Sequence, residues 1–211
     1  MLKQDLITSW KNRLNLTEAE LKAFSEVNRE DFLQKEQRLY AYQDVPLPIL
    51  RGKTISQPTT VMIMTSALQL KPGNTVLEVG SGSGYQTAII AKIIQKGIIH
   101  STEVIPELVH FARDNLKKAN INNVKVYEED GSRGISKEAP FDRIIITAAC
   151  SEFPKELLDQ LKPEGIILGP VGTKEEQEMV RGVKDKKGKL ALHFLGPFIF
   201  SPLYGKYGFE V

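Results

Sequence analysis

The chain has 211 residues, with 28 lysines and arginines against 26 aspartates and glutamates, a formal net charge of +2 and an apolar fraction of 41%. This length suits one globular domain with a sizeable core, and the balanced charge does not indicate nucleic acid or a membrane surface as a partner. A single cysteine excludes an internal disulfide, and no signal-peptide core or run of about 18 apolar residues is present, so we expect a cytoplasmic protein.

Residues 1–60 are predicted to contain two short helices and then an irregular segment. Apolar residues recur at helical spacing at Leu2, Leu6, Trp10 and Leu14. Thr17 and Glu20 match a capping box, in which both side chains satisfy free backbone amides at a helix start. Helix-breaking residues then follow at Pro46, Pro48, Gly52 and Pro58, which favours an ordered loop or a pair of edge strands.

From residue 61 the pattern alternates between helices and strands. Helices are expected over residues 61–70, 86–95, 106–119 and 154–161, and strands over residues 75–79, 98–104, 124–127, 141–148 and 165–171. Gly97 is expected to cap the second of these helices, and Pro106 to open the third. Three further strands, 179–183, 190–195 and 198–200, are expected around a turn at 185–188. The alternation predicts a Rossmann-like, doubly wound, mostly parallel sheet with antiparallel strands at its C-terminal edge.

Residues 78–84, Glu-Val-Gly-Ser-Gly-Ser-Gly, form a glycine-rich turn between a buried strand and a helix. Such a turn lets backbone amides approach a ligand. A dinucleotide fingerprint would need a third glycine where Tyr85 stands, and a P-loop would need Lys-Ser or Lys-Thr after its second glycine. The nucleophile elbow would need its serine at Gly82. The remaining pattern, acidic-x-G-x-G-x-G, resembles the first motif of the Rossmann-like S-adenosylmethionine-dependent methyltransferases.

Two further features follow the next two strands. Glu103 ends a strand about 20 residues after the loop, where a carboxylate can accept hydrogen bonds from both ribose hydroxyls. Asp130 and Gly131 follow the strand at 124–127, suitably placed to contact an adenine amino group. Open α/β sheets bind ligands at the carboxyl ends of their strands. We therefore predict S-adenosyl-L-methionine as the cofactor, S-adenosyl-L-homocysteine as its product, and a cofactor site at Glu78, Gly80, Gly82, Gly84, Glu103, Asp130 and Gly131.

The segment before the sheet is similar to one narrower family. Residues 41–49 read A-Y-Q-D-V-P-L-P-I and residues 52–58 read G-K-T-I-S-Q-P, and both closely resemble the protein-L-isoaspartate O-methyltransferase family. The likeness covers roughly residues 27–203, and T-I-S-Q-P is its specific part. The resemblance implies methyl transfer to the α-carboxylate of L-isoaspartyl residues in damaged proteins. The ester then collapses without the enzyme to a succinimide, which reopens partly to normal aspartate, so the implied role is protein repair.

The resemblance also implies roles for particular residues. Ser56 is carried over as the catalytic residue beside the substrate carboxylate, and Thr54 and Ile55 belong to the same cofactor-and-substrate strip. The substrate side is expected to include Ser56, Pro58, Thr59, Leu203 and Tyr204. Thr59 stands where the family often has Tyr or His, and Tyr204 is bulkier than usual, so both predict altered peptide selection or activity.

Other residues suggest no different chemistry. His100, His110 and His193 lack ligand spacing, so no metal is expected, and Cys150 is interpreted as a small packing residue. Two alternatives stay open: an RNA or small-molecule methyltransferase, which predicts a basic stripe, and a non-catalytic module that binds cofactor or peptide. We expect isoaspartyl proteins and peptides as partners, no nucleic acid or membrane, and a monomer. The single domain is divided into residues 1–60 with the substrate-side loop, the cofactor-binding core 61–175, and C-terminal strands 176–211.

Overall fold

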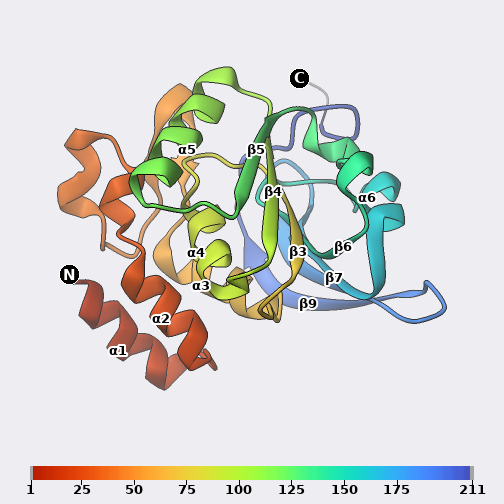
Figure 1. The fold of residues 1–211 in the computed structure, drawn as a ribbon, viewed down its shortest axis with the longest axis horizontal. Coiled ribbons are helices and arrows are strands. Elements are labelled where there is room, and N and C mark those ends of the chain that lie inside the picture. Colours follow the sequence, from red (N-terminus) through yellow and green to blue (C-terminus); the bar gives the residue numbers. More distant parts are fainter. Residues whose placement is uncertain (1, 210–211) are drawn as a thin grey trace.

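Seven strands form one sheet in the computed structural model, which describes residues 2–209 (Figure 1). Their order is β5-β4-β3-β6-β7-β8-β9, and the chain order reverses between β3 and β6. The first five strands in this order, β5 to β7, are parallel to one another. β8 and β9 extend the sheet at one edge as antiparallel strands. The strands are β3 Thr75–Val79, β4 Ile98–Glu103, β5 Val124–Glu128, β6 Phe141–Ile146, β7 Leu161–Gly172, β8 Gln177–Lys184 and β9 Leu190–Phe198. The predicted mostly parallel sheet with an antiparallel edge is confirmed.

Helices cover both faces of this sheet because successive strand residues point to opposite sides. On one face, Val76, Ile145 and Leu168 share a core with the N-terminal helices. On the other, Leu77, Ile144 and Ile146 pack with residues around the last helix. Figure 1 shows α1–α5 on one side of the sheet and α6 on the other. The helices are α1 Lys3–Arg13, α2 Glu18–Glu26, α3 Pro58–Ala67, α4 Tyr85–Ile94, α5 Pro106–Lys118 and α6 Lys155–Gln160.

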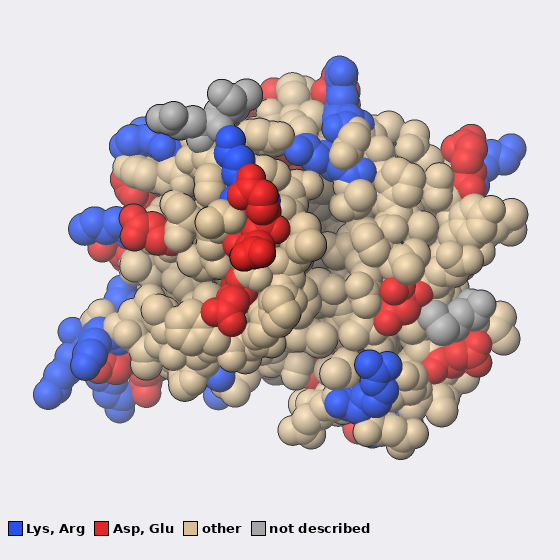
Figure 2. Space-filling view, turned by 180° about the vertical axis from the view of Figure 1, so that it is seen from behind, with Lys and Arg blue, Asp and Glu red and all other residues tan. Residues whose placement is uncertain are grey.

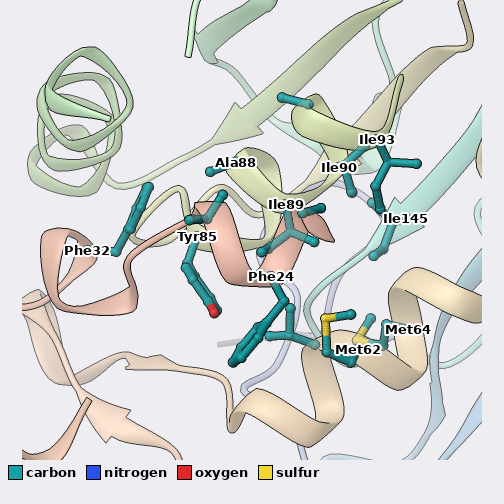
Figure 3. Packing of buried hydrophobic residues seen from close by; sticks show 14 of the residues in the cluster. Phe24, Phe32, Met62, Met64, Tyr85, Ala88, Ile89, Ile90, Ile93 and Ile145 are labelled. Atoms are coloured by element: carbon teal, nitrogen blue, oxygen red, sulfur yellow. The ribbon is translucent and has the colours of Figure 1, made fainter. Parts of the chain in front are cut away.

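The N-terminal helices are part of the main core. Phe24 of α2 lies against α3 and α4, close to Met62 and Ile89 (Figure 3). All three side chains are buried, and each contributes on the order of 1.5–3 kcal/mol to folding. The predicted capping box of α2 is confirmed, since Thr17 N donates to Glu20 Oε2 at 2.7 Å and Glu20 N to Thr17 Oγ1 at 3.3 Å. This packing holds the segment that follows α2 against the sheet.

That segment contains short 3-10 helices and one small hairpin. The strands β1 Leu47–Pro48 and β2 Thr54–Ile55 pair in antiparallel fashion, which confirms the edge-strand alternative. The helix α3 begins at Pro58 rather than at the predicted residue 61, because a proline at the first helical position lacks only an amide that would have no helical partner. The substrate-side strip therefore runs directly into a helix.

Two local predictions were wrong. Gly97 does not cap α4: Gln95 is the C-cap, with φ +51°, and Gly97 instead packs so closely on Asn74 that an added Cβ would lie 2.1 Å from its carbonyl oxygen. No strand forms over residues 198–200 beyond the end of β9, because Phe200 N donates to the side chain of Gln177 at 2.9 Å instead of to a neighbouring strand. Among residues 2–209, no helix is long and apolar enough to cross a membrane.

Candidate active site

A cavity of about 1050 Å³ opens at the carboxyl ends of β3 to β7, where the chain order reverses. This is the place where open α/β sheets bind their ligands. Its lining includes residues 53–57, 59 and 60 before and within α3, residues 80–83 of the glycine loop, and residues 197–204 at the end of β9 and beyond it. The ends of β4 to β8 and the turns beside them supply most of the rest. Of the residues that the sequence predicted, it brings together Thr54, Ile55, Ser56, Thr59, Gly80, Gly82, Glu103, Gly131, Leu203 and Tyr204.

The glycine loop is bound to the neighbouring strands. Gly80 N and Ser81 N both donate to the carbonyl of Thr102 at 2.9 Å, which ties the loop to the end of β4. Gly80 has φ +100°, and an added Cβ would lie 2.4 Å from Thr147 Oγ1 on the other side. Only glycine adopts this conformation readily, and only glycine leaves room here. The loop backbone can therefore face the cavity without a side chain in the way.

Glu103 lies at the cavity wall with its carboxylate already oriented. Its Oε2 accepts from Gly82 N at 3.0 Å, and its Oε1 accepts from Val104 N at 2.9 Å and Ile105 N at 3.1 Å. The side chain is largely buried, with 8% of the residue exposed. A carboxylate oxygen can accept more than one hydrogen bond, so capacity remains for hydroxyl donors from a ligand.

Four predicted residues lie outside the cavity lining. Glu78 is buried below the loop, where its Oε2 accepts from the hydroxyls of Thr87 and Ser101, and burial raises the pKa of its carboxyl to about 7. Gly84, the N-cap of α4, packs against α5. Pro58 is the buried first residue of α3. The fourth is Asp130.

The carboxylate of Asp130 is engaged elsewhere. Its Oδ1 accepts from Ser132 N at 3.0 Å and Ser132 Oγ at 2.7 Å, which caps the 3-10 helix Gly131–Arg133. Its Oδ2 accepts from Lys206 N at 2.8 Å in the C-terminal segment. Gly131 does line the cavity, and an added Cβ there would lie 2.1 Å from Thr102 Oγ1. Asp130 thus holds the turn that presents Gly131.

The strip before α3 is held from behind the cavity. Ser56 is half-buried, and its carbonyl accepts from Arg29 Nη2 at 2.9 Å. The Thr59 hydroxyl accepts from Trp10 Nε1 at 2.8 Å and donates to Asp44 Oδ2 at 2.6 Å. The indole of Trp10 therefore stands next to Thr59, the position where the family often has Tyr or His.

The C-terminal segment closes the cavity from the other side. Leu203 N donates to the carbonyl of Ala149 at 2.8 Å, just beyond β6. Lys53 Nζ donates to the hydroxyl of Tyr204 at 3.1 Å and lies 4.4 Å from the centroid of its ring. Sequence reasoning missed Arg29, Lys53 and most of residues 197–202. Their contacts join positions far apart in the chain, so only the spacing of the family motif could have pointed to them.

The remaining titratable candidates do not enter this cavity. No group of three or more His, Cys, Asp or Glu side chains within residues 2–209 could hold a metal ion. Cys150 is buried with its Sγ 3.6 Å from the carbonyl oxygen of Pro170, and burial raises the pKa of its thiol to about 12. It therefore stays a neutral packing residue at neutral pH.

A doubly wound sheet with this glycine loop at the reversal of chain order, and a carboxylate at the end of the next strand, defines an S-adenosylmethionine-dependent methyltransferase. Residues 1–208 match the model of the protein-L-isoaspartate(D-aspartate) O-methyltransferase family, PCMT. The chain belongs to this family.

Curated relatives and solved structures agree with this assignment. The protein-L-isoaspartate O-methyltransferase of Methanococcoides burtonii is 45% identical over 190 residues, covering 90% of this chain and 93% of that protein. The corresponding enzyme of Pyrococcus horikoshii is 41% identical over 219 residues, covering 100% and 99%. One solved protein-L-isoaspartate O-methyltransferase has a TM-score of 0.90 at 28% identity, covering 98% of this chain and 67% of its own. A Plasmodium falciparum structure in complex with S-adenosyl-L-homocysteine has a TM-score of 0.81 at 25% identity, covering 96% and 98%.

Proposed function

We propose that this chain transfers a methyl group from S-adenosylmethionine to the α-carboxylate of L-isoaspartyl residues in damaged proteins and so initiates their repair. The observation that carries the proposal is the convergence of two segments on one cavity. Ser56, in the strip 54–58 that resembles the family, lines the same cavity as the glycine loop and Glu103.

The residues of the cavity fit S-adenosylmethionine. A Cβ at Gly80 or Gly131 would clash, so both positions keep bare backbone at the wall. We propose that the loop backbone at Gly80 and Gly82, together with Thr54 and Ile55, holds the cofactor while Glu103 accepts from its ribose. Glu78, Gly84 and Asp130 act one layer behind, by holding the loop, the start of α4 and the turn at Gly131. When bound, S-adenosylmethionine supplies an electrophilic methyl group on a sulfonium.

Ser56 is the residue that we assign to the reacting carboxylate. A carboxyl group with a reference pKa near 4 is ionised at neutral pH, so the acceptor needs no general base. The hydroxyl of Ser56 donates a hydrogen bond to this carboxylate and orients it toward the methyl group. Positioning therefore supplies most of the catalysis.

The substrate side is formed by residues on opposite walls of the cavity. Thr59 and Leu203 line it from α3 and from the C-terminal segment, and Pro58 supports the strip by starting α3. Tyr204, held by Lys53, also lines the cavity. On the face seen in Figure 2, lysine and arginine side chains are dispersed among acidic ones around a central hollow, not gathered into the stripe that an RNA substrate would favour. The cytoplasm remains our predicted location, which the single buried thiol supports.

Matched peptides that contain isoaspartate or aspartate at one position test the proposed function. With labelled S-adenosylmethionine, we expect a base-labile methyl ester on the isoaspartyl peptide and none on the aspartyl peptide. The isoaspartyl linkage places the α-carboxylate where only that isomer can reach Ser56. Absence of the ester on the isoaspartyl peptide, with a folded protein that binds S-adenosylhomocysteine, would refute the proposal.

Ser56→Ala should lower kcat while leaving cofactor affinity nearly unchanged. A hydrogen bond to a charged group contributes about 1.5–3 kcal/mol, so a decrease of roughly 10- to 100-fold is expected. Ser66→Ala is the matched control. Ser66 lies on α3 and is partly exposed, as Ser56 is, but it does not line the cavity. Calorimetry with S-adenosylhomocysteine checks the second half of the prediction: a large loss of binding would show that Ser56 holds the cofactor instead.

A further inference from the structure

A buried arginine lies directly behind the strip that carries Ser56. Arg29 begins the short 3-10 helix Arg29–Phe32 and is fully buried, at 0% exposure. Its Nη1 donates to the carbonyl of Ala41, and its Nη2 donates to the carbonyls of Val45 at 3.2 Å and Ser56 at 2.9 Å. One guanidinium thus joins three points of the irregular segment between α2 and α3.

The same guanidinium contacts the helix that follows the glycine loop. Its central carbon lies 6.0 Å from the centroid of the Tyr85 ring, and Tyr85 is the first residue of α4. Phe32 packs on Tyr85 from the same 3-10 helix, with ring centroids 5.5 Å apart, and Figure 3 shows these two rings side by side. Arg29 therefore touches the Ser56 strip on one side and the start of the cofactor-side helix on the other.

The chemistry of this position suits arginine. The acceptors are main-chain carbonyls, and a planar fork with several donors can serve them at once, whereas a lysine ammonium cannot match that geometry. Burial lowers the pKa of Arg29 to about 10, while the charges of Tyr85, Asp44 and Tyr42 act in the opposite direction and raise it. The guanidinium therefore stays charged at neutral pH. A buried charge is costly unless it is hydrogen-bonded, and this one is bonded to the loops that it orders.

We propose that Arg29 is a positioning residue for methyl transfer, which sets the distance between the Ser56 strip and the glycine loop. This inference rests on the proposed function. In-line transfer needs the acceptor and the methyl group to be aligned closely, and a misplacement of about 1 Å can cost roughly 100-fold in rate. Arg29 acts through the backbone of Ser56 and through the Tyr85 ring, without contact with either reactant.

Arg29→Lys tests this, because it keeps the charge but loses the fork. We expect kcat with the isoaspartyl peptide to fall about 30-fold, and the Kd of S-adenosylhomocysteine to stay within about threefold. Arg143→Lys is the matched control. Arg143 is 8% exposed and donates to the carbonyls of Leu68 at 2.6 Å and Gln69 at 3.0 Å, outside the cavity lining. That variant should lower the melting temperature and leave kcat unchanged.

A double variant separates positioning from a merely structural role. If Arg29 acts through Ser56, Arg29→Lys should lower kcat only a few-fold in the Ser56→Ala background, against about 30-fold in the wild type. Equal factors in both backgrounds, or wild-type kcat for Arg29→Lys, would overturn the proposal. If Arg29→Lys does not fold, Tyr85→Leu replaces it. That change removes the ring that the guanidinium faces, together with its packing on Phe32, and the same dependence on Ser56 is expected. No ester with the wild type would refute the proposed function itself, whereas an active wild type with an unaffected Arg29→Lys refutes only the positioning role.

Discussion

Gly80→Ala should weaken the binding of S-adenosylhomocysteine by about 100-fold, the loss expected when two hydrogen bonds between the loop and a ligand are misaligned. The backbone at Gly80 has φ +100°, which an L side chain adopts only with strain. The new Cβ would also lie 2.4 Å from Thr147 Oγ1. The Thr147 side chain cannot change rotamer without losing hydrogen bonds, because its hydroxyl donates to the carbonyls of Val79 at 3.0 Å and Gly80 at 2.6 Å. The loop must therefore move, and the backbone that it presents to the cavity moves with it.

Gly73→Ala provides the matched control for this variant. Gly73 precedes the same strand, has φ +87°, and has no atom within 4 Å of an added Cβ. Both substitutions should cost about 1–3 kcal/mol of stability through backbone strain, which thermal melting measures. Only Gly80→Ala should lose affinity in calorimetry. Wild-type affinity for Gly80→Ala would show that the loop backbone is not part of the cofactor site.

Glu103→Ala should raise the dissociation constant of S-adenosylhomocysteine by at least about 100-fold. Two hydroxyls of a ribose would lose a charged acceptor, at about 1.5–3 kcal/mol for each hydrogen bond to a charged group. The substitution also removes the acceptor of Gly82 N, Val104 N and Ile105 N, so the adjoining backbone loses its support. The effect should therefore fall on cofactor affinity, and the KM for the isoaspartyl peptide should change little at saturating cofactor.

Glu128→Ala is the control for charge. Glu128 lies opposite Glu103 at the end of the neighbouring strand β5, and its side chain is exposed. Glu128→Ala removes the same charge from the same edge of the sheet without touching the cavity. The dissociation constant of S-adenosylhomocysteine should therefore stay at the wild-type value. Equal affinities for wild type and Glu103→Ala would rule out the assignment of Glu103 to the ribose.

The sequence alone was enough to predict the framework of this protein. Strand β3 over residues 75–79 and the capping box at Thr17 are local patterns, and local backbone geometry decides them. The glycine spacing excluded a dinucleotide site because Tyr85 occupies the third glycine position. Parallel strands end at one edge, so the placement of Glu103 beside the loop also followed from the order of the elements.

Only the tertiary structure decided how the cavity walls are held. Arg29 reaches Ser56 across 27 residues, and Lys53 reaches Tyr204 across 151. Neither contact produces a periodic pattern in the sequence, because packing of distant elements brings the partners together. The same holds for Asp130, which carries a cofactor motif in the sequence but in the fold accepts from Lys206 N. Local propensity and spacing therefore determined the class of site, and long-range hydrogen bonds between loops, which no local pattern encodes, determined which residues position it.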